Sequence, residues 1–165
     1  TLHTNSAAGA IPRLLDMQCE PFLLVSTLDI VIGQRLIRKL CETKEQYFLS
    51  KAQFSDISKA VDMNHILDIL KEEKIVAKTA VWDKIPFYKA KASPESEDGY
   101  KGRIGIHEVL KISPSIKDLV MKRASAKEIE DQAKREGMLT MIEDGIFKAV
   151  QGVTTIEEVL RVVSE

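Results

Sequence analysis

The fold class depends most on residues 20–40, which read EPFLLVSTLDIVIGQRLIRKL. The run Phe22–Ile32 is apolar on nearly all sides, which is typical of a buried helix or a buried strand, and its length favours the helix. Gly33 interrupts this run, and the alternation over Gln34–Leu40 indicates a short strand. The stretch therefore predicts a buried helix followed by a strand.

The residues before this stretch extend the pattern. Thr1–His3 is typical of the end of a strand, Thr4–Ser6 offers a helix N-cap, and Ala7–Met17 carries apolar side chains on one helical face. The order strand, helix, helix, strand is typical of the tail of an α/β sheet. Because the chain begins neither with Met nor like a domain, we expect a fragment in which the missing sheet leaves apolar surface exposed over Phe22–Ile32.

The segment 42–98 is more polar. Phe54–Glu73 predicts one or two helices. Ile75–Trp82 and Ile85–Tyr88 predict the strands of a hairpin, in which the proline of the second strand indicates a sheet edge. Ser93–Gly99 has three acids and no apolar residue, as expected of a flexible loop.

The segment 99–165 predicts a small helical bundle led by one strand, Gly102–Leu110. Three helix starts and two stops follow that strand. The starts are Ser113-Pro114 and the capping boxes Ser125–Glu128 and Thr154–Glu157, and the stops are Gly137 and Gly152.

Composition excludes several classes of protein. The 165 residues carry 24 basic and 25 acidic side chains, and 44% are hydrophobic, which suits one globular domain or two small ones. A net charge near −1 does not suit a strongly basic nucleic-acid binder, and the basic residues of 54–88 are interleaved with acids, so we expect no nucleic-acid partner. Cys19 and Cys41 are too few for a disulfide scaffold or a four-cysteine zinc site.

The sequence contains no complete catalytic motif. It has no G-x-x-x-x-G-K-[ST] phosphate-binding loop, no G-x-G-x-x-G, no H-E-x-x-H, no C-x-x-C and no G-x-S-x-G. Arg103, close to Lys101, is expected to pair with the acidic residues of 95–98.

Two groups of residues are candidate sites. His3, followed by Thr4 and Asn5 at the entry to a helix, is well placed to bind an anion, because a helix N-terminus presents unpaired N–H groups. The alternative is a solvent-exposed histidine beside a helix cap. Arg35, close to Arg38 on the predicted strand, suits bidentate phosphate binding or, alternatively, a solvated strand edge.

Four segments resemble successive parts of one protein family. They read TLHTNSAAGAIPRLLDM (1–17), EPFLLVSTLDIVIGQRLIRKLC (20–41), GYKGRIGIHEVL (99–110) and GMLTMIEDGIFKAVQGVTTIEEVLRV (137–162). In this order they are similar to the secretion ATPases, the hexameric motors of type II secretion and type IV pilus assembly.

The resemblance implies an α/β fold with three parts. These are the tail of a RecA-like ATPase core over 1–41, a small α+β insertion over 42–98 and a C-terminal strand with a helical bundle over 99–165. It also implies that the phosphate-binding loop and the acidic metal-binding strand precede Thr1. The chain would then be the C-terminal part of such an ATPase.

The resemblance further implies roles for single residues. His3 would sense or contact the γ-phosphate of ATP, with Thr4 and Asn5 beside it, and Arg35 would lie near the nucleotide or a subunit boundary. ATP and Mg²⁺ are the implied cofactors of the whole protein. Many members hold a metal ion through four cysteines, but here only Cys41 lies in that region. We therefore expect no zinc in this chain and an insertion held together by apolar residues; weak binding by the acids of 95–98 is the alternative.

The implied function is that of a motor. A homohexamer would couple ATP hydrolysis to pilus or pseudopilus assembly, acting on an inner-membrane platform protein and other secretion or pilus components. It would be cytoplasmic and peripherally associated with the inner membrane. The isolated chain would be inactive because it lacks the phosphate-binding loop. The alternative is a non-catalytic interaction module of a secretion or pilus machine, for which the capped helices of 113–165 offer a binding face.

Overall fold

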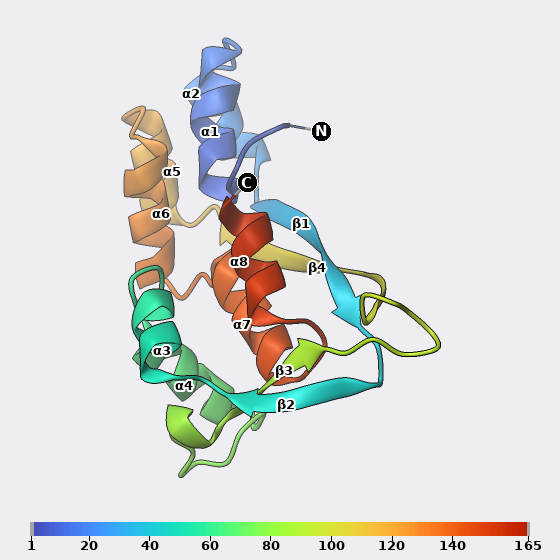
Figure 1. Cartoon of the computed structure of the whole chain (residues 1–165). Helices are drawn as coiled ribbons and strands as arrows, with labels where there is room; N and C mark the ends of the chain where they lie inside the picture. Colours follow the sequence, from blue (N-terminus) through green and yellow to red (C-terminus); the bar gives the residue numbers. More distant parts are fainter. Residues whose placement is uncertain (1, 165) are drawn as a thin grey trace. The chain divides into compact units, whose positions relative to one another are not determined.

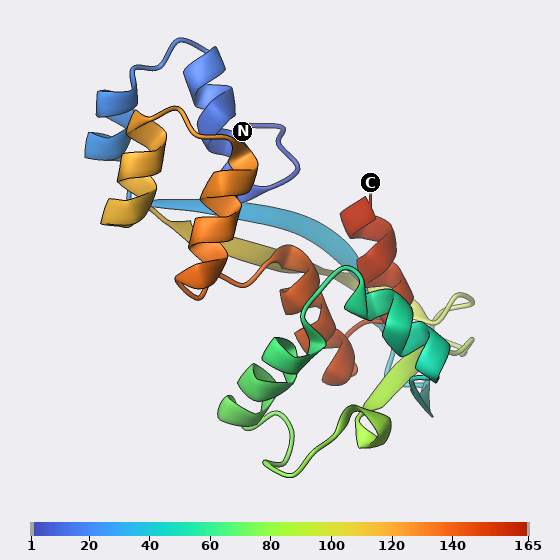
Figure 2. The same ribbon diagram turned by 90° about the vertical axis from the view of Figure 1, so that its left-hand side faces the viewer.

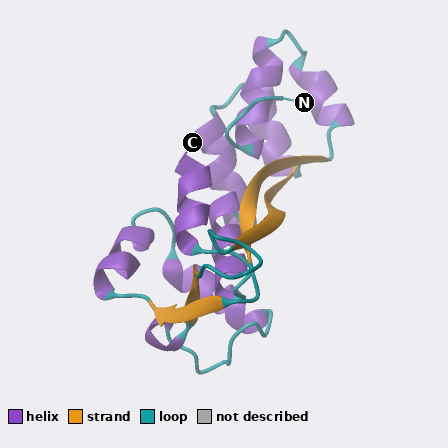
Figure 3. Ribbon diagram, turned by 45° about the vertical axis from the view of Figure 1, so that its right-hand side comes forward, coloured by secondary structure: helices purple, strands orange, loops and turns teal. Residues whose placement is uncertain are grey.

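The structure, a computed structural model, describes residues 2–164. Within that range it contains eight α-helices, one short 3₁₀ helix and four strands, which pair as two two-stranded antiparallel sheets (Figures 1 and 3). The predicted mixed α/β class is therefore confirmed. The RecA-like core and the insertion remain predictions.

Contacts divide the chain into two units. The first unit comprises the residues up to Gln34 together with His107–Met141, and the second comprises Arg35–Ile106 together with the residues from Ile142 onward. Each unit therefore combines distant parts of the chain. The helices expected to form one bundle over 99–165 are shared between the two units, whereas the boundaries 1–41, 42–98 and 99–165 remain predictions about domains.

The first unit is a cluster of four helices beside the ends of two paired strands. Its elements are α1 (Ala7–Asp16), α2 (Pro21–Thr27), the start of β1 (Ile30–Leu40), the end of β4 (Tyr100–Lys111), α5 (Pro114–Met121) and α6 (Ala126–Arg135). Helix α1 packs on α6, and both α2 and α6 pack on α5 (Figure 2). The core includes Ile11, Leu110, Ile116 and Ile129, all fully buried. These residues close the unit around one apolar centre.

The helix caps of the first unit agree with the sequence. The Oγ atoms of Ser6, Ser113 and Ser125 accept hydrogen bonds at the starts of α1, α5 and α6. The capping box of Ser125 with Glu128 is complete. Gly137, just after α6, has a φ of +92°, the left-handed region that glycine tolerates best. Caps are local features, so local sequence predicts them.

The decisive stretch 20–40 folds differently from its prediction. Helix α2 ends at Thr27, and β1 begins at Ile30 and runs through Gly33, so no single buried helix spans Phe22–Ile32. Phe22 is 57% exposed and Ile32 62% exposed, which confirms the expected exposed apolar surface and overturns burial. The physical reason is that, among the described residues, β1 pairs with one strand only and its face with Ile32 lies open.

The expected strand end at Thr1–His3 is also absent where it can be judged. Thr1 lies outside the described residues, and Leu2–Thr4 has no regular structure. A strand requires a partner for its backbone groups, and none of the described strands pairs with Leu2 or His3.

The second unit joins a small sheet to four helices. It contains the rest of β1 and β4, and then β2 (Lys44–Phe48), α3 (Lys51–Ser58), α4 (Met63–Glu72), η1 (Trp82–Lys84), β3 (Pro86–Ala90), α7 (Met141–Val150, from Ile142 on) and α8 (Ile156–Ser164). Strands β2 and β3 are antiparallel, with Lys44 opposite Ala90 and Phe48 opposite Pro86. The segment 54–73, which was expected to form one or two helices, contributes to two, α3 and α4.

The hairpin expected over residues 75–88 is wrong. Ile75–Val81 forms no strand, and the partner of β3 is β2, not the preceding segment. The reason lies in the core: Trp82 is buried, its ring lies 6.3 Å from the rings of both Phe54 and Phe87, and its Nε1 donates to the carbonyl of Met63 at 3.0 Å. The β-branched run 75–82 therefore ends in a tryptophan that packs in the core, and it does not pair as a strand.

The start of α8 lies one residue later than predicted. Thr155, rather than Thr154, caps the helix, because its Oγ1 accepts from the N–H of Glu158 at 3.1 Å. The hydroxyl of Thr154 donates instead to the carbonyl of Arg38 at 2.8 Å.

Helix α7 has no predicted start, although Thr140 and Glu143 have the spacing of a capping box.

Candidate functional site

The residues predicted to meet a nucleotide lie in different units. His3, Thr4 and Asn5 belong to the segment that leads into α1, in the first unit, whereas Arg35 lies on β1 in the second. His3 and Asn5 are exposed, and the hydroxyl of Thr4 donates to the carbonyl of Ser6 at 3.0 Å. The structure thus places the first three residues on one loop. The nucleotide-binding roles of all four remain predictions.

Two backbone N–H groups in the first turn of α1, behind this loop, already donate to protein oxygen atoms. The N–H of Gly9 donates to Ser6 Oγ at 3.1 Å, and the N–H of Ala7 donates to Oε1 of Glu108.

Glu108 anchors the loop from within the first unit. Its side chain comes from β4 and is buried, with the residue 5% exposed. Burial raises the pKa of Glu108, and hydrogen bonds from the backbone of Ala7 and Met141 oppose this effect. Gly33 makes room for it, since a Cβ there would lie 2.8 Å from Glu108 Cγ. The sequence signal for Glu108 is an acid at an inward position of a strand, between Ile106 and Leu110.

We expect Glu108→Ala to lower the free energy of unfolding by about 2 kcal/mol, because it leaves the buried N–H of Ala7 unpaired and opens a cavity. Glu108→Gln keeps the volume and one acceptor, so we expect a cost below about 1 kcal/mol. Urea unfolding measures both, and amide hydrogen exchange at Ala7 shows whether the start of α1 opens. Glu20→Ala, at an exposed acid of the same unit, is the control. Equal effects of Glu108→Ala and Glu20→Ala would contradict this role.

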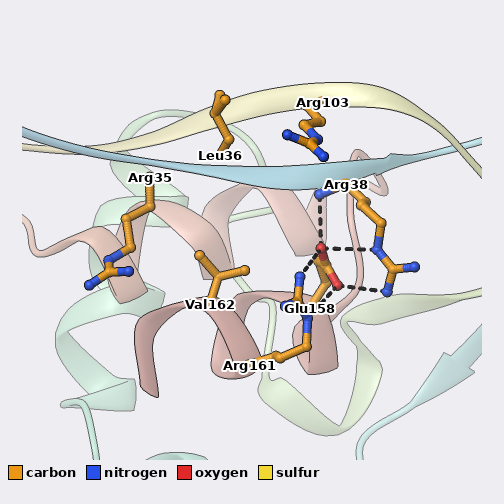
Figure 4. A pocket seen from close by; sticks show the side chains of 7 residues that line it. All are labelled: Arg35, Leu36, Arg38, Arg103, Glu158, Arg161 and Val162. Carbon is orange, nitrogen blue, oxygen red and sulfur yellow. Dashed lines mark hydrogen bonds and ion pairs between the residues drawn. The ribbon is translucent and has the colours of Figure 1, made fainter. Parts of the chain in front are cut away.

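The second unit contains a pocket of about 320 Å³ with a strongly basic lining (Figure 4). Strand β1 contributes Arg35 and Arg38, β4 contributes Arg103, and α8 contributes Glu158 and Arg161. Its apolar lining residues are Leu36 and Val162. The pocket therefore brings four arginines and one carboxylate together from segments far apart in sequence.

Glu158 is the fixed centre of this pocket, with 1% of its side chain exposed. Its Oε1 accepts from the backbone N–H of Arg38 at 3.0 Å, from Arg38 Nε at 3.1 Å and from Arg161 Nη2 at 2.9 Å. Its Oε2 accepts from Arg38 Nη2 at 2.9 Å and from Arg161 Nε at 3.2 Å. Figure 4 shows the two guanidinium groups on either side of the carboxylate. Both arginines are thereby held in set orientations.

These contacts determine the charge of Glu158. Burial alone would raise its pKa, but the hydrogen bonds from Arg38 and Arg161 outweigh burial and lower the pKa to about 2. The same pairing raises the pKa of Arg38, above all through its hydrogen bond with Glu158. Glu158 is therefore ionised at neutral pH.

Arg38 is held by further groups of the second unit. Its guanidinium carbon lies 4.1 Å from the centre of the Tyr100 ring, and its Nη1 lies 3.2 Å from Oδ2 of Asp98. The acidic loop thus pairs with Arg38, and Lys101 pairs with Glu95 at 3.5 Å. From the sequence, Arg103 is expected to have that role, and neither Glu158 nor Arg161 is predicted. Their signal is an acid and an arginine three residues apart on a helix, with the acid at an inward position.

No group of three or more His, Cys, Asp or Glu residues in the range 2–164 is arranged to hold a metal ion. Over the same residues, none of the helices has the length and apolar character needed to cross a bilayer.

Comparison with known proteins assigns the family. The family described as type II/IV secretion system protein matches residues 1–161. The type II secretion system protein E of Xanthomonas campestris pv. campestris is 40% identical, and the type IV pilus assembly ATPase PilB of Pseudomonas aeruginosa is 34% identical; each alignment covers all of this chain and 26% of the relative. The PilB of Thermus thermophilus is 37% identical over 97% of this chain and 16% of its own length. The chain thus spans about a quarter or less of these relatives, and it belongs to the type II/IV secretion system protein family.

Proposed function

We propose that this chain is part of a motor ATPase subunit that couples ATP hydrolysis to pilus or pseudopilus assembly at the inner membrane. The observation that carries the proposal is the match along the whole chain to proteins named for type II secretion and for type IV pilus assembly, two of them named as ATPases. In the proposal the subunit forms a homohexamer with a RecA-like core. It binds ATP and Mg²⁺ and acts on an inner-membrane platform protein from the cytoplasmic side.

The loop before α1 supports a role beside the nucleotide. His3 and Asn5 are exposed on one loop, and Glu108 fixes the helix start from which the loop extends. In the proposal His3 contacts or senses the γ-phosphate, Thr4 and Asn5 assist it, and Arg35 lies near the nucleotide or a subunit boundary. An imidazole donates or accepts a proton near neutral pH, which suits it to detect a phosphate group that is present or absent.

The residues of this chain do not by themselves fit a complete nucleotide site. The sequence contains no phosphate-binding loop, and the N–H groups of Ala7 and Gly9 are occupied by protein oxygen atoms. Phosphoryl transfer depends on such a loop, on a bound metal ion and on a positioned water. In the proposal these parts come from outside the chain, and the chain supplies the loop of His3 and the packing of its two units.

We expect the purified 165-residue chain to release no inorganic phosphate from MgATP above the rate without protein. The reason is that a metal ion and phosphate-binding groups supply most of the stabilisation in phosphoryl transfer. A colorimetric phosphate assay measures this, with the product of the complete gene as the positive control. Turnover by the chain alone would contradict the division of roles. Lack of turnover by the complete product would favour a non-catalytic interaction module instead.

A further inference from the structure

The basic pocket of the second unit is lined by more arginines than acids. Four arginines line it, Glu158 is its only lining acid, and Asp98 lies against Arg38 from outside the lining. Like charges gathered in one concave site repel one another, so an anion that enters the site is attracted by all of them.

Glu158 fixes the orientation of two of these arginines. Both of its oxygens accept hydrogen bonds from Arg38 and Arg161, and its side chain is almost fully buried. Its effect is to hold two guanidinium planes in place before a ligand arrives. A rotamer-rich side chain that is already immobilised loses less entropy on binding, which strengthens the site.

The size of the pocket and the type of residue indicate the ligand. A volume of about 320 Å³ lies at the lower end of the range for small-molecule sites, enough for a compact polar ligand. The guanidinium group donates two parallel hydrogen bonds to phosphate oxygens, and several arginines together favour a ligand with more than one negative charge.

We propose that the pocket lined by Arg38, Arg103 and Arg161 binds a phosphate-bearing anion with at least two negative charges. The ligand is either a free oligophosphate or the phosphate headgroup of a lipid; the recognising chemistry is the same. This proposal does not depend on the proposed ATPase function, because its test measures binding without turnover and replaces Arg103, which has no role in that function.

The test uses inorganic pyrophosphate as the probe and isothermal titration calorimetry of the 165-residue chain at low salt. We expect one pyrophosphate bound per chain. Arg103→Gln should weaken the affinity about tenfold, since a charge-assisted hydrogen bond contributes on the order of 1.4 kcal/mol. Lys101→Gln is the matched control, because it removes the same charge from β4 outside the lining, and its affinity should stay within about twofold of the wild type. Arg103 is exposed, so thermal unfolding should be unchanged by its replacement.

Sedimentation with vesicles distinguishes the two sources of phosphate. Binding to phosphatidylglycerol vesicles, but not to phosphatidylcholine vesicles, that is lost in Arg103→Gln and displaced by pyrophosphate would assign a lipid headgroup. Pyrophosphate binding without vesicle binding would assign a free anion. The proposal is overturned by an absence of pyrophosphate binding at millimolar concentration, or by equal losses in Arg103→Gln and Lys101→Gln. It is also overturned if Arg103→Gln abolishes self-association while the wild type binds no pyrophosphate, because the occupant would then be an acidic segment of a second copy.

Discussion

Replacement of Glu158 by alanine is expected to lower the free energy of unfolding by about 3 kcal/mol. The change leaves Arg38 and Arg161 without the carboxylate that both contact, and removing one partner of a buried ion pair costs on the order of 3–5 kcal/mol. We take the lower end because both guanidinium groups are partly exposed to water. Urea unfolding followed by circular dichroism measures the change.

The neighbouring acid supplies the control for this prediction. Glu157 is exposed, and Glu157→Ala should change stability by less than about 0.5 kcal/mol. If both alanine variants unfold at the same urea concentration, Glu158 does not organise the second unit, and the arrangement of the pocket is wrong.

Glu158 also predicts how stability depends on pH. Its pKa is about 2 in the folded chain against an ordinary value of 4.5, so the folded state favours the ionised form. This contribution is complete above pH 4.5 and is lost as the pH falls toward 2, a change of about 3 kcal/mol. Glu158→Gln should lack this part of the acid destabilisation. The raised pKa of Glu108 acts in the opposite direction in both proteins, so it cancels when the variant is compared with the wild type.

Replacement of Trp82 by alanine is expected to have the largest effect of all, about 4 kcal/mol. The side chain is 7% exposed, packs between the rings of Phe54 and Phe87, and donates its indole N–H to Met63. Removing a buried tryptophan costs on the order of 3–5 kcal/mol through lost transfer energy and the cavity left behind. Trp82→Phe keeps an aromatic ring and should cost about half as much. Val81→Ala, at an exposed neighbour, should stay within about 0.5 kcal/mol.

This prediction tests what holds residues 42–98 together. If apolar packing around Trp82 does so, a chelator such as EDTA should leave the unfolding midpoint of the wild type unchanged, while Trp82→Ala lowers it. A drop in the midpoint with EDTA, restored by added zinc, would show that a bound metal ion stabilises this segment instead. Small domains held by a metal ion unfold when it is removed, so the two causes give different results.

The sequence predicted local features well and distant pairings poorly. The caps at Ser6, Ser113 and Ser125 follow from residues within one helical turn, and all three are present. The partner of β3 lies about forty residues before it, and the donor to Glu158 lies 120 residues away. Neither pairing leaves a periodic signal, because it depends on how separate segments pack.

In the candidate site, too, features of single residues were predicted and contacts between distant segments were not. Arg35 was selected from the sequence by its charge on a strand, and it does line the basic pocket. Glu158 and Arg161 were missed because each is one charge among many on an amphipathic helix, and only burial of the carboxylate distinguishes it. The apolar residues at the start of β1 led to a wrong prediction. Ile30 and Ile32 were expected to be buried, but both are exposed. An apolar side chain favours burial, but its presence in the sequence does not show which segment or partner buries it.

We propose that this chain is one part of a secretion-family ATPase whose phosphate-binding loop lies outside it. The most direct measurement is the sequence of the gene upstream of the codon for Thr1. We expect an open reading frame that continues upstream through a G-x-x-x-x-G-K-[ST] loop and an acidic strand that binds the metal ion. A start codon immediately before Thr1, or a long upstream region without that loop, would contradict it.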